Sequence, residues 1–248
     1  MSATFLREVS LNPANAAILA RWQQLELPNA WLVAGCLFQT IWNLQSGRPP
    51  ESGIKDYDLF YFDADDLSES GEQQAQAKVS TAFADLGVTI EVANQARVHH
   101  WYPGHFGRPY PELASSEDGI KRFLVLETCV GVRPGVCHAP YGLAGVYEGT
   151  LSPNPLTPYP ELFAEKVASY RARWPNLGKV PSSSMAPNPS VKALPPVAGT
   201  LRDKTPRSAP YLERSAAPEH NQLSLVGSIG KSLRQALRVQ NATPFRSC

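Results

Sequence analysis

The stretch that most constrains the fold of this chain is a run of strand-forming residues interrupted by acids, K-D-Y-D-L-F-Y-F-D at residues 55–63. Alternate side chains of a strand point to opposite faces of a sheet, so Asp56 and Asp58 share a face. Two carboxylates this close in a poorly solvated place repel each other unless a cation lies between them. The pattern therefore favours Mg²⁺, which proteins hold with one or two carboxylates and substrate phosphates. A solvated loop is the alternative interpretation, since Asp-x-Asp pairs are common there.

A third candidate ligand lies in the next apolar segment, V-T-I-E-V at residues 88–92. Alternation places Val88, Ile90 and Val92 on one face of a strand and Glu91 on the other. If this strand neighbours the first one, Glu91 converges with the two aspartates. The alternative is that Glu91 is an exposed residue of an edge strand.

Hydrophobic periodicity and turn residues predict the remaining elements of the globular part. Helices are expected over residues 13–25, from Gly35 to about residue 46, over 68–86 and over 163–174; short strands over 31–34 and 128–132; a helix or helix-to-strand unit over 117–127; and a turn with a short helix over 138–147. Alternating helices and strands are typical of an α/β protein.

Backbone and basic groups suggest where a phosphate could bind. Gly35 breaks the chain between a strand and a helix, so the first N–H groups of that helix could face a phosphate; an ordinary tight turn is the alternative. The loop at residues 47–54 leads to Lys55, which could face a triphosphate or lie in solvent. The segment at 94–110 is turn-rich and aromatic, and suggests a ligand-handling surface. Its Arg97 has a planar fork suited to phosphate, whereas each of its histidines is expected to be structural.

The sequence predicts three regions: a globular domain over residues 1–177, a Pro/Ser-rich disordered linker over 178–220, and a basic tail over 221–248 with the spacing of a short amphipathic helix. Residues 1–178 carry 13 Lys+Arg and 19 Asp+Glu, whereas residues 179–248 carry 10 and 3. An acidic body disfavours a long nucleic acid held by its phosphates.

The four cysteines show no zinc-type spacing and are expected to be reduced thiols. The N-terminus lacks a signal-peptide pattern, and no apolar run approaches 18 residues. We therefore expect a cytoplasmic protein with no integral membrane association. The oligomeric state stays open.

Several ordered blocks resemble the DNA polymerase beta-like nucleotidyltransferase superfamily, and within it a family of uncharacterised, mostly bacterial proteins. The blocks are A-G-C-L-F-Q-T-I-W-N (34–43), G-I-K-D-Y-D-L-F-Y-F-D (53–63), V-A-N-Q-A-R-V-H (92–99), T-C-V-G-V-R (128–133), A-P-Y-G-L (139–143) and K-V-A-S-Y-R-A-R-W-P (166–175). The resemblance implies a nucleotidyltransferase-type mixed sheet flanked by helices, an α/β (α+β) fold. It also implies that Gly35 and Cys36 contact a triphosphate, although Cys36 stands where the superfamily has a small or hydroxyl residue.

The resemblance implies that Asp56, Asp58 and Glu91 hold two divalent ions, Mg²⁺ or Mn²⁺. The expected function is transfer of NMP from an NTP to an acceptor hydroxyl with release of pyrophosphate, aided by Arg97 and Lys55. The acceptor, whether a protein, a small molecule or a nucleic acid end, stays open. A catalytically inactive nucleotide- or partner-binding module is the main alternative, and phosphoester hydrolysis at the same site is a third.

Overall fold

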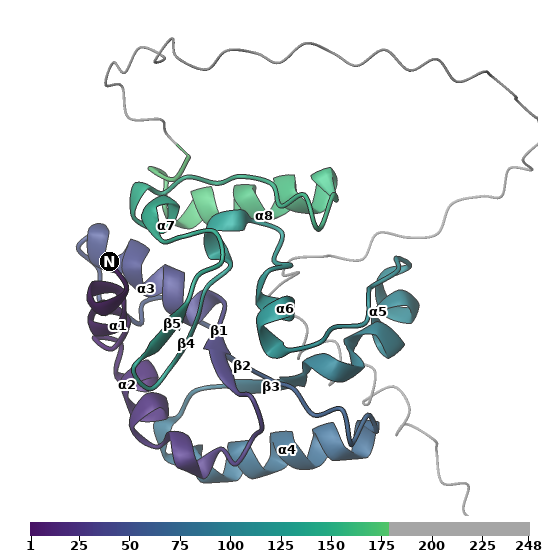
Figure 1. The fold of residues 1–248 in the computed structure, drawn as a ribbon. Coiled ribbons are helices and arrows are strands. Elements are labelled where there is room, and N and C mark those ends of the chain that lie inside the picture. Colours follow the sequence, from purple (N-terminus) through teal and green to yellow (C-terminus); the bar gives the residue numbers. More distant parts are fainter. Residues whose placement is uncertain (179–248) are drawn as a thin grey trace, which may run out of the picture. The chain divides into compact units, whose positions relative to one another are not determined.

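A computed structural model describes residues 1–178 of the chain. Apart from Gly178, the predicted linker over 178–220 and the predicted tail over 221–248 lie outside the described residues. Figure 1 shows the described strands in the centre, with α1, α2 and α3 on one side of them and α6 on the other.

The strands form one five-stranded mixed sheet in the order β3-β2-β1-β4-β5. They are β1 (Trp31–Val33), β2 (Tyr57–Tyr61), β3 (Ile90–Asn94), β4 (Gly131–Arg133) and β5 (Val136–His138). β2 and β3 pair in parallel, and the other neighbours pair antiparallel. The predicted mixed sheet flanked by helices is confirmed.

Eight α-helices of the described residues surround the sheet. They are α1 (Ser2–Val9), α2 (Pro13–Ala20), α3 (Gly35–Gln45), α4 (Glu69–Ala82), α5 (Val98–Phe106), α6 (Ser116–Ile120), α7 (Ala144–Glu148) and α8 (Pro160–Arg173). Side-chain caps explain where two of them begin, since Asn12 accepts from the backbone of Ala14 and Ser68 accepts from that of Gly71. The crossover between the parallel strands β2 and β3 is α4, as expected for a parallel pair.

Several elements differ from the sequence predictions. The helix expected over 13–25 ends at Ala20 and continues as a 3₁₀ turn, and the helix expected over 68–86 likewise ends at Ala82 before a 3₁₀ turn. The sequence predicted neither α1 nor β5. The segment at 94–110, read as turns, contains α5 although Pro103 and Gly104 lie inside that helix. Local propensity disfavours such a helix, but the ring of Tyr102 packs 4.5 Å from those of Phe106 and Tyr110, so tertiary packing overrides it.

The two faces of the sheet pack in separate cores, because side chains alternate along each strand. Leu32, Leu59 and Val92 point into the larger core, which α1, α2, α3 and α8 share. Trp31 and Phe60 point into a smaller core, where Ile120 of α6 lies. The acids of β2 and β3 belong to the face of the smaller core, since Asp58 precedes Phe60 by two residues.

None of the helices within residues 1–178 is both long enough and apolar enough to cross a membrane.

Candidate active site

Three carboxylates meet on one face of the sheet. Asp58 of β2 is aligned with Glu91 of β3, and in a parallel pair aligned side chains point to the same face. Asp56 directly precedes β2, so strand alternation puts it on that face as well. Asp56, Asp58 and Glu91 are only 9%, 6% and 3% exposed. The predicted pairing of the two strands is confirmed, and the alternative of Glu91 as an exposed edge residue is wrong.

The charges in this group are unfavourable as they stand. Burial raises the pKa of Asp58 well above its usual range, and the neighbouring charges of Asp56 and Glu91 raise it further. Oδ2 of Asp58 is buried and has no hydrogen-bond partner among residues 1–178. Such an oxygen beside two more carboxylates fits a divalent cation, which would supply both the missing partner and the missing charge.

The three acids by themselves do not form a complete metal-binding site. Within residues 1–178, no group of three or more His, Cys, Asp or Glu side chains is arranged so that it could already hold a metal ion. Mg²⁺ needs only one or two carboxylates when substrate phosphates complete its shell. The residues present therefore fit an ion that arrives together with a phosphorylated substrate.

The turn between β1 and α3 lies beside these acids. Val33, the last residue of β1, is aligned with Asp58, and α3 begins two residues later at Gly35. Ala34 between them has φ 63° and ψ −140°, a conformation that non-glycine residues adopt at a cost of about 1–3 kcal/mol. A Cβ at Gly35 would lie 2.5 Å from Nε2 of Gln39, so a side chain there would displace Gln39. The turn thus points the N-terminus of α3 toward the acids' end of the sheet.

The side chain of Cys36 faces the core and not this end of α3. Cys36 is fully buried, and its thiol donates to the Val33 carbonyl at 3.2 Å. Burial and then the charge of Asp58 raise the pKa of the thiol well above its usual range, so it stays neutral. A contact of Cys36 with a nucleotide would therefore come from its backbone N–H.

A buried polar network fixes α3 against the neighbouring helices and β2. Asn15 and Thr40 both donate to the Cys36 carbonyl, at 2.8 and 2.7 Å. Asn12 donates to Thr40 at 3.2 Å, and its oxygen accepts from the Tyr57 hydroxyl at 3.2 Å. These bonds hold the first turn of α3 and the first residue of β2 in one arrangement, which rigidly positions the acids next to the turn.

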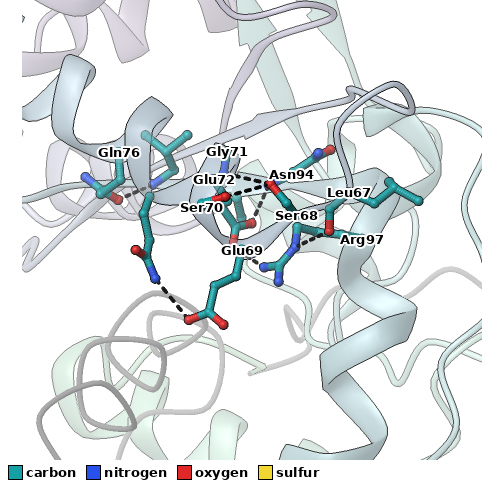
Figure 2. Close-up of polar contacts among 12 residues, drawn as sticks. Leu67, Ser68, Glu69, Ser70, Gly71, Glu72, Gln76, Asn94 and Arg97 are labelled. Atoms are coloured by element: carbon teal, nitrogen blue, oxygen red, sulfur yellow. Dashed lines mark hydrogen bonds and ion pairs between the residues drawn. The ribbon is translucent and has the colours of Figure 1, made fainter. Parts of the chain in front are cut away.

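The two basic residues that the sequence predicted at the site, Lys55 and Arg97, do not lie among the acids. Lys55 directly precedes Asp56 and is exposed. Arg97 follows the C-terminal end of β3, whereas Glu91 lies near its start. The Arg97 guanidinium is buried, forms an ion pair with Glu72 and donates to the Leu67 carbonyl at 3.3 Å (Figure 2). This placement favours a structural role for Arg97, and its contact with nucleotide stays a prediction.

Two basic residues of α8 that the sequence reading missed lie near the acids instead. Burial and the charge of Arg173 lower the pKa of Lys166 to about 8, while the charges of Asp58 and Asp56 act in the opposite direction. Arg173 donates to Oε1 of Gln39 at 3.0 Å, which links α8 to the side chain that covers Gly35. Lys166 and Arg173 are two helical turns apart, and this spacing inside the block at 166–175 was the signal that could have revealed them.

Comparisons with known proteins agree with this geometry. A nucleotidyltransferase family matches residues 20–178. A solved structure whose title reads "The NMR structure of the protein reveals a CCA-adding enzyme head domain" is similar at a TM-score of 0.57 and 26% sequence identity, over 70% of this chain and 92% of that one. No curated protein matches the sequence.

Proposed function

This chain belongs to the nucleotidyltransferase family, and we propose that it transfers NMP from an NTP to an acceptor hydroxyl, releases pyrophosphate, and depends on Mg²⁺ or Mn²⁺. The observation that carries the proposal is the alignment of Asp58 with Glu91, two buried carboxylates beside the strand-to-helix turn at Gly35. Buried acids in this position need a cation, and a turn that opens a helix suits a phosphate.

The three acids would hold the divalent ions. Asp56 and Asp58 would contribute to both ions, and Glu91 would complete the one nearer the acceptor. When bound, the ions would lower the pKa of the attacking hydroxyl and stabilise the charge of the leaving pyrophosphate. Oδ2 of Asp58 has no hydrogen-bond partner in the described part of the chain, which supports the role of Asp58 as a ligand.

The triphosphate would lie between the N-terminus of α3 and α8. The backbone N–H groups at Gly35 and Cys36 would donate to phosphate oxygens, and Lys166 and Arg173 would neutralise their charge. Electrostatic coupling of Lys166 to Asp58 and Asp56 supports this assignment. Lys55 would add a more distant, solvated charge.

The reaction follows from this arrangement. The oxygen of the acceptor hydroxyl forms a bond to the α-phosphorus, the bond to the bridging oxygen of the β-phosphate breaks, and the hydroxyl proton passes to a carboxylate or to solvent. Attack and departure are in line, so acceptor and pyrophosphate lie on opposite sides of the α-phosphorus.

The test is pyrophosphate release from each of the four NTPs with Mg²⁺ or Mn²⁺, with self-labelling by α-labelled nucleotide followed in parallel. We expect release or labelling in the wild type and a loss of at least ~100-fold in Asp58→Asn. Asp65→Asn, an exposed residue after the same strand, is the matched control and should keep full activity. Full activity of Asp58→Asn would contradict the assignment.

A second candidate function, a catalytically silent nucleotide-binding module, is favoured by one observation. The Cys36 thiol is turned into the core, so the site lacks the hydroxyl donor that the superfamily places there. This module would bind NTP in a metal-dependent way that Asp58→Asn abolishes, yet release no pyrophosphate with any acceptor. Calorimetric titration of NTP beside the release assay separates the two functions.

A further inference from the structure

A pocket lies on the sheet face that carries the acids, and the proposed mechanism does not use it. Its empty volume, including the part open to solvent, is about 580 Å³. Five aromatic side chains line it: Phe60, Tyr102, Phe106, Tyr110 and Phe123. Arg122 adds a cation to the same wall, and Gln95 closes the pocket near the end of β3.

Strand register places this pocket in line with the proposed phosphate site. β1 and β2 are antiparallel, with Val33 opposite Asp58 and Trp31 opposite Phe60. Gly35 therefore lies beyond Asp58 in one direction, and Phe60 lies about 7 Å from Asp58 in the other. A pyrophosphate that leaves toward Gly35 requires an attacking group from the side of Phe60.

The charged side chain of the pocket lining is that of Arg122. The Arg122 guanidinium is half-buried and makes no hydrogen bond or ion pair within residues 1–178. Asp118, the nearby acid, forms an ion pair with Lys121 at 3.1 Å, and the charge of Arg122 is the smallest of the influences that lower the pKa of Asp118. A planar cation that is partly desolvated and forms no hydrogen bond or ion pair within residues 1–178 favours a carboxylate or a phosphate group on a ligand.

The walls of the pocket favour a planar ring. Phe60 and Phe123 pack edge to face at 5.7 Å, and Tyr102 packs at 4.5 Å against both Phe106 and Tyr110. Such surfaces bind aromatic groups by stacking and edge contacts. The base of an NTP carries no negative charge for Arg122, and the excess of acidic residues in 1–178 disfavours a polyanionic nucleic acid.

We infer that this pocket receives the acceptor, and that the acceptor is a small hydroxyl-bearing compound with a planar aromatic part and one anionic group bound by Arg122. The inference rests on the proposed function, because it assigns the second substrate of that site. The acceptor hydroxyl would lie toward Asp58, attack the α-phosphorus as described above, and end as a phosphodiester to the nucleoside.

The test uses 4-hydroxybenzoate as the probe, titrated into the full-length protein without NTP and followed by ligand-observed NMR. We expect a Kd of about 1 mM or below for the wild type. Arg122→Gln should weaken binding by at least ~10-fold, which corresponds to about 1.4 kcal/mol. Arg133→Gln is the matched control, since Arg133 lies 4.5 Å over the Trp31 ring and outside the pocket lining, and it should bind as the wild type does.

Two further measurements test whether the anionic group and the aromatic lining determine the binding of the probe. 4-Hydroxybenzamide, the neutral analogue, should bind the wild type at least ~10-fold more weakly and be insensitive to Arg122→Gln. Phe106→Ala, which removes an aromatic ring from the pocket lining, should weaken 4-hydroxybenzoate binding while NTP binding stays within ~2-fold of the wild type. NTP binding that falls with Arg122→Gln or Phe106→Ala would make the pocket a nucleoside site and overturn the inference.

Absence of 4-hydroxybenzoate binding, or equal binding of the neutral analogue, would also overturn it. These arms are read without turnover, so they are independent of the proposed function. If the protein binds the probe through Arg122 but never releases pyrophosphate, the ligand site is supported and the proposed transferase activity is contradicted.

Discussion

Single residues of the site carry charges that are buried before any ligand arrives. Asp58 lies next to two other carboxylates, and burial alone already disfavours its charged form. Lys166 is the cation whose charge offsets part of this cost. The metal-bound triphosphate that we propose as the ligand would bring both signs of charge to this site.

Lys166 predicts a pH dependence of NTP binding. Its pKa is lowered to about 8, so the side chain is a cation below pH 8 and becomes neutral above it. We expect the Kd for NTP to rise by up to ~10-fold between pH 7 and pH 9.5. Lys166→Gln should bind NTP weakly at both pH values and lack this step. A wild-type profile that stays flat through pH 8 would contradict the assignment.

The lowered pKa of Lys166 also affects the stability of the fold. Stability should rise with pH, whereas NTP affinity should fall. Because the pKa of Lys166 in the folded protein lies below the ordinary lysine value of 10.5, the folded protein binds fewer protons than the unfolded chain between about pH 8 and 10.5. The contribution of Lys166 to the free energy of unfolding should therefore rise with pH in this window. Comparison of wild type and Lys166→Gln by urea denaturation isolates this contribution.

Arg97 should matter for stability more than for nucleotide binding. Its ion pair with Glu72 is buried, and removal of one partner leaves the other charge uncompensated. Arg97→Gln should lower the free energy of unfolding by about 3–5 kcal/mol, measured by urea denaturation, with NTP affinity within ~2-fold of the wild type. The double variant Arg97→Met, Glu72→Met should recover part of the loss. A large loss of NTP affinity at unchanged stability would place Arg97 at the nucleotide.

At the scale of elements, α4 protects the outer edge of the sheet. Gln76 donates to the Ile90 carbonyl at 2.8 Å and accepts from the Val92 N–H at 2.9 Å, and Glu72 accepts from the Asn94 N–H at 2.8 Å. Glu72 and Gln76 are one turn apart, so one face of the helix follows the strand (Figure 2). Side chains thus take the place of a sixth strand and leave no open edge for another chain at these positions.

Gln76→Ala tests this edge. The change leaves a backbone donor and a backbone acceptor of β3 without partners, so we expect a loss of about 1–3 kcal/mol in unfolding free energy. Hydrogen exchange of the Val92 amide should become ~10- to 100-fold faster. Gln73→Ala is the control and should change neither quantity, because the Gln73 amide donates to the exposed Glu69 and not to β3. Unchanged exchange at Val92 in Gln76→Ala would show that the helix does not protect the strand.

At the scale of the whole molecule, every group of the proposed site lies within residues 1–178. The Gly178 N–H donates to the Gly149 carbonyl, so a chain that ends after Gly178 keeps this last bond. We expect such a truncated protein to unfold cooperatively and to bind Mn²⁺ and NTP within ~3-fold of the full chain. Titration of both proteins in parallel measures this. A loss of more than 10-fold would assign part of the site to residues 179–248.

Local geometry let the sequence predict much of this fold and site. Strand alternation alone put Asp56 and Asp58 on one face and Glu91 opposite Ile90 and Val92, because the pleat is a property of the backbone. The ordered sequence blocks also indicated the mixed sheet before any contact was known. Predictions were weakest where propensity misled, as in α5, whose Pro103 reads as the end of a helix.

Contacts between distant residues were decided only by the tertiary structure. By itself the sequence determined that Asp58 and Glu91 lie on strands and that Asp56 lies at the start of the first one. The parallel pairing of β2 with β3 then aligned Asp58 with Glu91. The fold likewise paired Arg97 with Glu72 and brought Lys166 from α8 toward the acids. Charged side chains follow no period that reveals their partner, since their pairing depends on which elements pack together, and local sequence does not encode that choice.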